Sequence, residues 1–112
     1  MSLITTHILD TMKGRPAQGV PVTVEFRSTF DWTEVGKGET NSDGRITDLL
    51  PKDAKLPKGI YRLTFDTAAY FSAQGVKAFY PAVTVAFEIH DHGHTHIPLL
   101  LSPFGYTTYR GS

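Results

Sequence analysis

The 112-residue chain contains no cysteine. Disulfide bonds therefore cannot hold the fold together, and zinc sites built on thiolates are excluded. The sequence also lacks any apolar stretch approaching the roughly 20 residues that a membrane helix needs. Its N-terminus, MSLITTHILD, has no basic segment followed by a long apolar run, unlike a signal peptide. These absences fit a reducing compartment, and we expect a cytoplasmic protein with no membrane partner.

The sequence has no excess of charge of either sign. Lys and Arg together number 11, as do Asp and Glu, so the formal net charge is zero. Nucleic acids and anionic membranes are bound by basic patches, so this balance argues against both classes of partner. The length indicates a single domain spanning residues 1–112, large enough to bury one core.

Apolar residues recur at every second position, which is typical of half-buried strands. The alternation is clearest in residues 20–26, 61–65, 83–89 and 97–101. Near the N-terminus, Ile4 and Ile8 flank Thr6 on one face, which turns Thr5 and His7 to the other. Turn signals separate these segments, namely KGRPAQG, GKGE, NSDG, LPKG and SPFG. Short strands at this spacing predict an all-β sandwich.

One segment, DTAAYFSAQG at 66–75, has a different pattern and predicts a single short helix. Asp66 or Thr67 can cap its start, and Gly75 can end it. A second helical turn is compatible with LLPKDAK, where Pro51 suits a first helical position.

Four of the five histidines stand at every second position in HDHGHTH, residues 90–96. On one straight strand, neighbouring histidines would be about 7 Å apart, too far to chelate tetrahedral zinc easily. Asp91 and Gly93 favour a turn, so we expect a loop over 90–94 and a strand from near Thr95. His90, His92 and His94 are then interpreted as solvated loop residues. Only His96 lies on regular structure, and it stays a candidate for function.

Three further features allow a functional or a purely structural interpretation. His7 stands in a strand of Leu, Ile and Thr, where a histidine is tolerated without a function. Arg45 follows the turn NSDG, where most arginines are solvated. The C-terminus, FGYTTYRGS, ends without a polar tail. It is either a final edge strand or a segment held in place because it lines a pocket.

Four stretches together resemble one known family: TTHILDTMKGRPAQGVPV, SDGRITDL, GIYRLTFDTAAYF and HTHIPLLLSPFGYTTYRGS. They cover essentially the whole chain and resemble the transthyretin-like 5-hydroxyisourate hydrolases of urate breakdown. The terminal YRGS is the most specific part, because it closes the sequences of this family and is lacking in transthyretin. The resemblance implies a transthyretin-like β-sandwich of two four-stranded sheets with one short helix. It also implies a homotetramer, a dimer of dimers with active sites where the dimers meet.

The resemblance assigns roles to individual residues. The catalytic residues of the family fall on His7, Arg45 and His96. The C-terminal tetrapeptide, which would bind substrate, falls on Tyr109, Arg110, Gly111 and Ser112. The chain departs from the usual pattern at Thr95, Ile97 and Phe104, where the family commonly has tyrosine, valine and tyrosine. None of these departures falls on a mapped catalytic position.

The implied reaction opens a cyclic amide of 5-hydroxyisourate with water, giving 2-oxo-4-hydroxy-4-carboxy-5-ureidoimidazoline, without a metal or another cofactor. Our hypothesis is that His7 and His96 converge on the attacking water. One would be the base, and the other would orient the water or protonate the leaving nitrogen; the sequence leaves their roles open. Arg45 and Arg110 offer forked donors for the substrate ring and for an oxyanion, and Tyr109 and Ser112 would orient substrate or water.

Two rival interpretations come from other functional classes. A transthyretin-like carrier of a small aromatic ligand shares the expected fold, and a fold alone does not determine function. Such a carrier has no need of His7, Arg45, His96 and the terminal tetrapeptide. The second rival is a zinc-binding β-domain that uses the histidines of 90–96.

Overall fold

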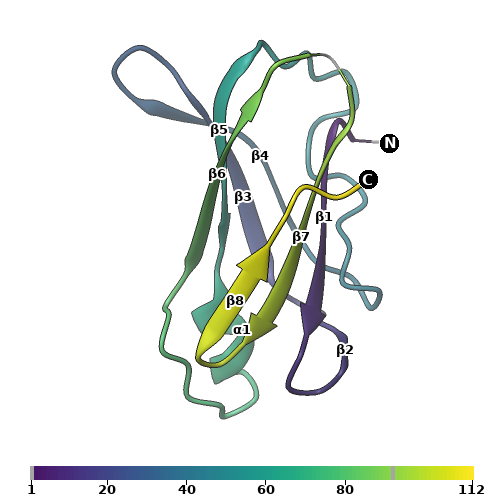
Figure 1. The fold of residues 1–112 in the computed structure, drawn as a ribbon, viewed down its shortest axis with the longest axis vertical. Coiled ribbons are helices and arrows are strands. Elements are labelled where there is room, and N and C mark those ends of the chain that lie inside the picture. The colour runs from purple at the N-terminus through teal and green to yellow at the C-terminus, as the bar shows by residue number, and fades with distance from the viewer. Residues whose placement is uncertain (1, 92) are drawn as a thin grey trace.

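The computed structural model describes residues 2–91 and 93–112, which form a sandwich of two four-stranded sheets (Figure 1). The first sheet has the order β2-β1-β7-β8, and the second has the order β4-β3-β5-β6. The first sheet consists of β1 (Ile4–Asp10), β2 (Arg15–Pro16), β7 (Thr95–Ser102) and β8 (Gly105–Thr108). The second consists of β3 (Pro21–Arg27), β4 (Trp32–Glu39), β5 (Gly59–Phe65) and β6 (Val83–Ile89). The predicted sandwich with one short helix, α1 (Thr67–Ser72), is confirmed.

The core lies between the sheets and is filled by alternate residues of each strand. In β1, Ile4, Thr6, Ile8 and Asp10 are buried, whereas the residues between them are only half-buried. Tyr61, Leu63 and Phe65 of β5 are fully buried opposite them. Because the side-chain period of a strand is two, burying Ile4 and Ile8 necessarily turns Thr5 and His7 to the outer face.

The pairing of β1 with β7 places two distant parts of the chain side by side. These strands are parallel, with Thr5 opposite His96 and His7 opposite Pro98. The buried hydroxyl of Thr6 donates to the carbonyl of Ile97 at 2.6 Å. The outer face of this sheet therefore carries His7 and His96 on neighbouring strands, one step apart along the sheet.

Helix α1 forms where the sequence predicts it. The Asp66 carboxylate caps its start by accepting from the Ala69 N–H at 3.0 Å, and Gly75 follows its end with a φ of 67°. The helix packs through Tyr70, whose hydroxyl donates to the buried carboxylate of Asp10 at 2.6 Å. No helix forms at the predicted second helical turn in LLPKDAK. The Ala54 N–H donates to the Pro51 carbonyl at 3.0 Å and closes one isolated turn.

The turn predicted for GKGE is wrong, because these four residues lie inside β4. Their two glycines are explained by close packing against the segment 46–50. A Cβ on Gly36 would collide with the carbonyl of Leu49, and one on Gly38 would lie 2.6 Å from Cγ2 of Ile46. The glycines therefore serve a close approach between backbone segments, which sequence alone does not distinguish from a turn.

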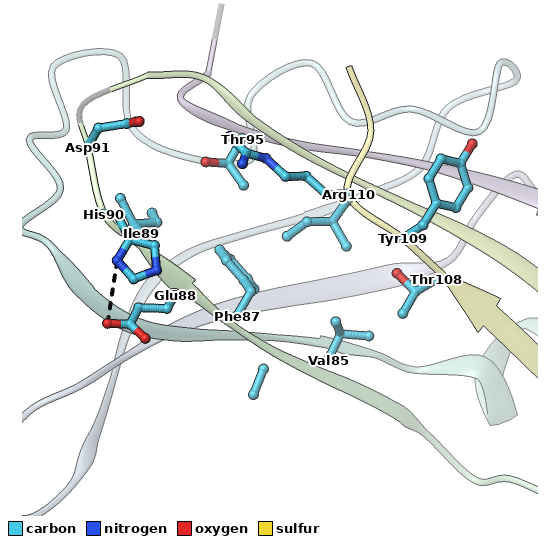
Figure 2. A pocket seen from close by; sticks show the side chains of 12 residues that line it. Val85, Phe87, Glu88, Ile89, His90, Asp91, Thr95, Thr108, Tyr109 and Arg110 are labelled. Atoms are coloured by element: carbon cyan, nitrogen blue, oxygen red, sulfur yellow. Dashed lines mark ion pairs between the residues drawn. The ribbon is translucent and has the colours of Figure 1, made fainter.

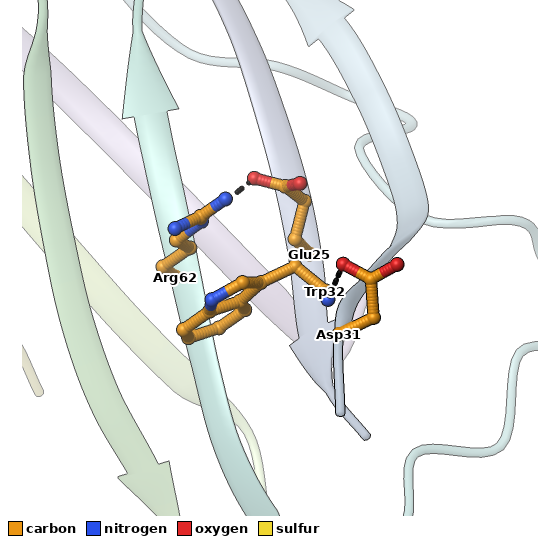
Figure 3. A network of polar contacts seen from close by, with 4 residues as sticks. All are labelled: Glu25, Asp31, Trp32 and Arg62. Carbon is orange, nitrogen blue, oxygen red and sulfur yellow. Dashed lines mark hydrogen bonds and ion pairs between the residues drawn. The ribbon is translucent and has the colours of Figure 1, made fainter. Parts of the chain in front are cut away.

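The outer face of the second sheet is held by a polar contact (Figure 3). Arg62 donates to Glu25 at 2.8 Å, and its guanidinium lies 4.1 Å from the ring centre of Trp32. The charge of Arg62 on this face is therefore paired with the Glu25 carboxylate.

Among the described residues, no helix has the length and apolar character needed to cross a bilayer.

Candidate active site

An open hollow of about 570 Å³ lies over the outer face of β1 and β7. It is lined by residues from the N-terminus, the 41–47 segment, β7 and the C-terminus, including Thr5, Arg45, His94, His96 and Ser112. Three of the predicted site residues, Arg45, His96 and Ser112, therefore meet in one cavity. Arg45 and Ser112, which meet there, are more than 60 residues apart in the sequence.

The turn at 41–45 carries Arg45 to the edge of β1. The side-chain oxygen of Asn41 accepts from the N–H groups of Asp43 and Arg45, at 2.9 and 3.1 Å. The carbonyl of Gly44 then accepts from the Ile8 N–H at 2.9 Å, which docks the turn on the strand. A side chain at 44 is excluded, because Gly44 has a φ of 73° and a Cβ there would meet the carbonyl of Ile8.

This docking pairs Arg45 with His7. The two residues form an isolated antiparallel bridge, so their side chains project from the same face of the sheet. His7 is half-buried and Arg45 is exposed. The structure thus brings together the two residues for which sequence patterns alone allowed a merely structural role, and it does so through backbone contacts of a local turn.

The C-terminus is fixed against His96. The Gly111 N–H donates to the His96 carbonyl at 2.8 Å, extending the sheet beyond β8. A Cβ on Gly111 would collide with the His96 ring and lie 3.0 Å from Cγ of Pro98. Only glycine lets the chain cross so close to the imidazole, and the crossing leads Ser112 into the hollow.

Thr5 and His94, which both line this hollow, were not among the predicted site residues. The Thr5 hydroxyl oxygen lies 2.8 Å from Nε2 of His94 and 2.8 Å from Nδ1 of His96. The rings of His94 and His96 stack with centres 6.3 Å apart. His94 is exposed, as expected of the loop, but it is bonded to the site and is not a freely solvated side chain. The signal was its even spacing from His96, which places both on one face once β7 is extended by one residue.

The other histidines of the run behave differently. β7 begins at Thr95, as predicted. His90 is exposed, with Nδ1 3.7 Å from a Glu88 carboxylate oxygen, and His92 lies outside the described residues. Within residues 2–91 and 93–112, no group of three or more His, Asp or Glu side chains is arranged to hold a metal ion.

The environment of His96 favours its neutral form. Its half-buried position is the largest cause lowering its pKa below the usual 6.5, followed by the positive charge of Arg45 and then by His94 and His7. Burial and nearby cations both disfavour an imidazolium. His96 is therefore a neutral imidazole, able to accept a proton, at neutral pH.

A family model described as the HIUase/Transthyretin family matches residues 4–111. The chain belongs to this family. The 5-hydroxyisourate hydrolase of Salmonella typhimurium is 44% identical over 112 residues, which cover 99% of this chain and 82% of that protein.

Two solved structures of the HIUase/Transthyretin family resemble this one closely. The 5-hydroxyisourate hydrolase of Klebsiella pneumoniae has a TM-score of 0.84 at 38% identity, covering 97% of this chain and 98% of that one. Sea bream transthyretin in complex with thyroxine has a TM-score of 0.91 at 37% identity, covering 98% and 95%. Since the fold resembles both, the choice between their functions depends on the site residues.

The terminal tetrapeptide of this family member is divided between two cavities. Ser112 lines the hollow at His96, and Gly111 packs against the His96 ring. Tyr109 and Arg110 instead line a second cavity of about 260 Å³ beside β6 (Figure 2). Figure 2 shows the Arg110 side chain running toward Thr95. Because side chains alternate along a strand, Thr95 and Ile97, which line this cavity, lie on the opposite face of β7 from His96. Within one chain, Tyr109 and Arg110 therefore do not join the other predicted site residues.

Proposed function

We propose that the protein hydrolyses 5-hydroxyisourate in urate degradation, at the hollow over β1 and β7. The observation that carries the proposal is the meeting of His96 and Arg45 in one cavity, with His7 paired to Arg45 beside it. Close relatives of the chain, at 44% identity, are 5-hydroxyisourate hydrolases. The chain is accordingly a hydrolase, and the roles of its residues follow from the geometry below.

His96 is assigned as the general base. Nδ1 of its ring is engaged with Thr5, which leaves Nε2 to take a proton from water. Its lowered pKa keeps the ring in the neutral form that this step requires. His7, one step away on the outer face, is assigned to hold the water or to protonate the leaving nitrogen. A general base is most effective when its pKa lies near the working pH, because it is then largely unprotonated but still basic enough to take a proton.

Arg45 is assigned to the oxygen that gains charge. The water oxygen forms a bond to the carbonyl carbon of the cyclic amide, its proton passes to His96, and the carbonyl oxygen becomes an oxyanion. Collapse of this intermediate breaks the carbon–nitrogen bond, and the leaving nitrogen takes up a proton. The fixed cation of Arg45 and its forked donors stabilise the oxyanion without any change of protonation state. Ser112, which also lines the hollow, is assigned to orient substrate.

The assembly is proposed to be a homotetramer. β6 and β8 end the two sheets, and terminal strands present backbone groups that a second copy can pair with. The outer face of β1 and β7 also carries half-buried Leu9 and Leu100, which lie opposite each other in the pairing of these strands. A second pair of chains over this face would cover both leucines and enclose the site. In this tetramer, Tyr109 and Arg110 are proposed to bind substrate in the site of a neighbouring chain.

The alternative is a carrier, because sea bream transthyretin, solved in complex with thyroxine, shares the fold of this chain. One experiment separates the two. Urate oxidase generates 5-hydroxyisourate from urate, and the decay of its absorbance is followed with and without the protein. A hydrolase accelerates the decay catalytically, in the presence of excess chelator as well. A carrier leaves the decay unchanged and binds thyroxine in a calorimetric titration.

A further inference from the structure

We infer that Thr5 and His94 are positioning residues for this hydrolysis, and that they set which ring nitrogen of His96 carries its proton. The inference rests on the proposed function, in which His96 acts as the base. Thr5 and His94 touch His96 and not the reacting atoms in this arrangement. They act through a chain of two hydrogen bonds, His96 Nδ1 to Thr5 Oγ1 to His94 Nε2, each 2.8 Å long.

These two hydrogen bonds are fixed in place by the secondary structure. Thr5 lies opposite His96 in the parallel pairing of β1 with β7, so their side chains meet on the outer face. His94 directly precedes β7 and projects to the same face as His96, with the planes of the two rings only 21° apart. The Leu3 carbonyl accepts from the Thr95 N–H at 2.8 Å, which holds the start of β7 against β1. The threonine is thus placed between two imidazoles by the register of the sheet.

A count of hydrogens limits the states of this chain. A threonine hydroxyl has one proton to donate, whereas each neutral imidazole has one N–H and one bare nitrogen. When the Thr5 hydroxyl proton is donated to one of the two imidazoles, the other imidazole must donate to Thr5. In one state, His96 donates from Nδ1 and Thr5 donates to His94, so Nε2 of His96 is bare. In the other, Thr5 donates to His96 and His94 donates to Thr5, so Nε2 of His96 carries the proton.

The two states have opposite chemical consequences. Only the first leaves a bare Nε2 that can take a proton from water; in the second, the same nitrogen can only donate. Arg45 lines the same hollow as His96, and its positive charge interacts better with a bare ring nitrogen facing the hollow than with an N–H there. The first state is therefore the one that the hollow favours. The other charged or titratable groups around His96 are His7, Asp43 and the terminal carboxylate of Ser112.

The first state also survives the reaction step. When Nε2 of His96 accepts the proton from water, Nδ1 keeps its own proton and continues to donate to Thr5. No hydroxyl has to rotate, and Thr5 still donates to His94. Thr5 and His94 thus have the same role as the third member of a hydrolytic triad, which orients an imidazole and holds its tautomer. Here a neutral hydroxyl and a second imidazole take the place of a carboxylate.

Substitutions at Thr5 test the inference. Thr5→Val keeps the β-branched shape but removes the hydroxyl, and Thr5→Ser keeps the hydroxyl. We expect Thr5→Val to lower kcat by about tenfold or more, part of the roughly 10²–10⁴-fold that a positioned base contributes, with little change in KM. Thr5→Ser should recover most of the loss. Thr23→Val, a half-buried threonine on the outer face of the other sheet, is the matched control and should keep the wild-type kcat.

The tautomer is read separately by ¹⁵N NMR of histidine-labelled protein, on the full chain in its native assembly. We expect a bare Nε2 and a protonated Nδ1 on His96 in the wild type, and loss of this pattern in Thr5→Val. His94→Phe, which keeps a stacked ring but no acceptor, should shift the pattern in the same direction and provides the test if Thr5→Val does not fold.

A wild-type His96 protonated on Nε2, or a wild-type kcat in Thr5→Val or His94→Phe, would overturn the inference. Equal losses in Thr5→Ser and Thr5→Val would overturn it as well, since the hydroxyl would not be the cause. A wild-type protein that does not accelerate decay of 5-hydroxyisourate overturns the proposed function instead. In that case the NMR spectrum still shows whether Thr5 sets the His96 tautomer, so the two failures are distinguishable.

Discussion

Gly111 crosses the ring of His96 so closely that a single added methyl group would collide with it. The same glycine donates its N–H to the His96 carbonyl at 2.8 Å. The C-terminus is thereby part of the wall that holds the imidazole, and Ser112 enters the hollow as a direct result. This relationship gives the terminal tetrapeptide a physical role that its sequence alone does not reveal.

Replacing Gly111 with alanine should therefore damage the site and not the fold. The added methyl must displace either the His96 ring or the C-terminus, so we expect kcat/KM to fall by about tenfold or more, since small misplacements of catalytic groups cost up to about 10²-fold. The melting temperature should change little, because the core is untouched. Gly75→Ala, at the end of α1 and far from the hollow, is not a suitable control because its φ of 67° introduces strain of its own. Thr23→Val serves instead.

The pH dependence of activity should reflect His96. Burial, Arg45, His94 and His7 all lower its pKa, so the folded protein binds this proton less readily than the unfolded chain does. The acid limb of kcat/KM should accordingly lie below pH 6.5. The same depressed pKa means that any stability linked to His96 is present above pH 6.5 and is lost as pH falls through the folded-state pKa. An NMR titration of His96 with a midpoint at or above 6.5 would contradict this assignment.

Tyr70 and Asp10 provide a contrasting prediction about stability alone. Tyr70→Phe removes the 2.6 Å bond to one oxygen of a buried carboxylate, whose other oxygen still accepts from Met12 and Lys13 at 3.0 Å. We expect a loss of about 1–3 kcal/mol in the free energy of unfolding, measured by denaturant titration. Activity at low temperature should be unchanged, because this contact lies at the end of β1 away from the hollow. An unchanged unfolding midpoint would show that the bond is not stabilising.

Tyr70 also predicts behaviour at high pH. Its burial, and then its bond to Asp10, raise the pKa of the phenol from 10.0 to about 12. Because the folded-state pKa is raised, the stability linked to Tyr70 is complete below pH 10 and is lost as pH rises toward 12. The wild type should therefore lose more stability between pH 9 and 12 than Tyr70→Phe does. Parallel denaturant titrations of the two proteins across this range provide the measurement.

Local sequence patterns were sufficient for some of this structure and insufficient for the rest. The outward position of Thr5 and His7 follows from the burial of Ile4 and Ile8, because alternation is a property of a single strand. The turn predicted at Gly36 and Gly38 is wrong, because these glycines lie inside a strand. The segment that packs against them comes close only when the chain folds. The spacing of residues within one strand predicts which face each side chain occupies. It does not predict which distant segment packs against that face.

The site itself divides along the same line. Arg45 is brought to His7 by a turn whose sequence, NSDG, is visible locally, although its docking partner is not. The role of His94 depends on Thr5, which is 89 residues away, and so on the register of β1 against β7. Tyr109 and Arg110 line a different cavity from His96 within one chain, and their mapped roles stay a prediction about the assembled protein.

The central claim, that the hollow over β1 and β7 is the site of hydrolysis, is tested most directly by His96→Asn. Asparagine keeps a polar side chain of smaller size but offers no nitrogen that takes a proton from water. The kcat for 5-hydroxyisourate, measured as the protein-dependent decay of its absorbance, should fall by about 10²–10⁴-fold while the assembly keeps the wild-type mass in light scattering. A folded His96→Asn protein with wild-type kcat would contradict the account.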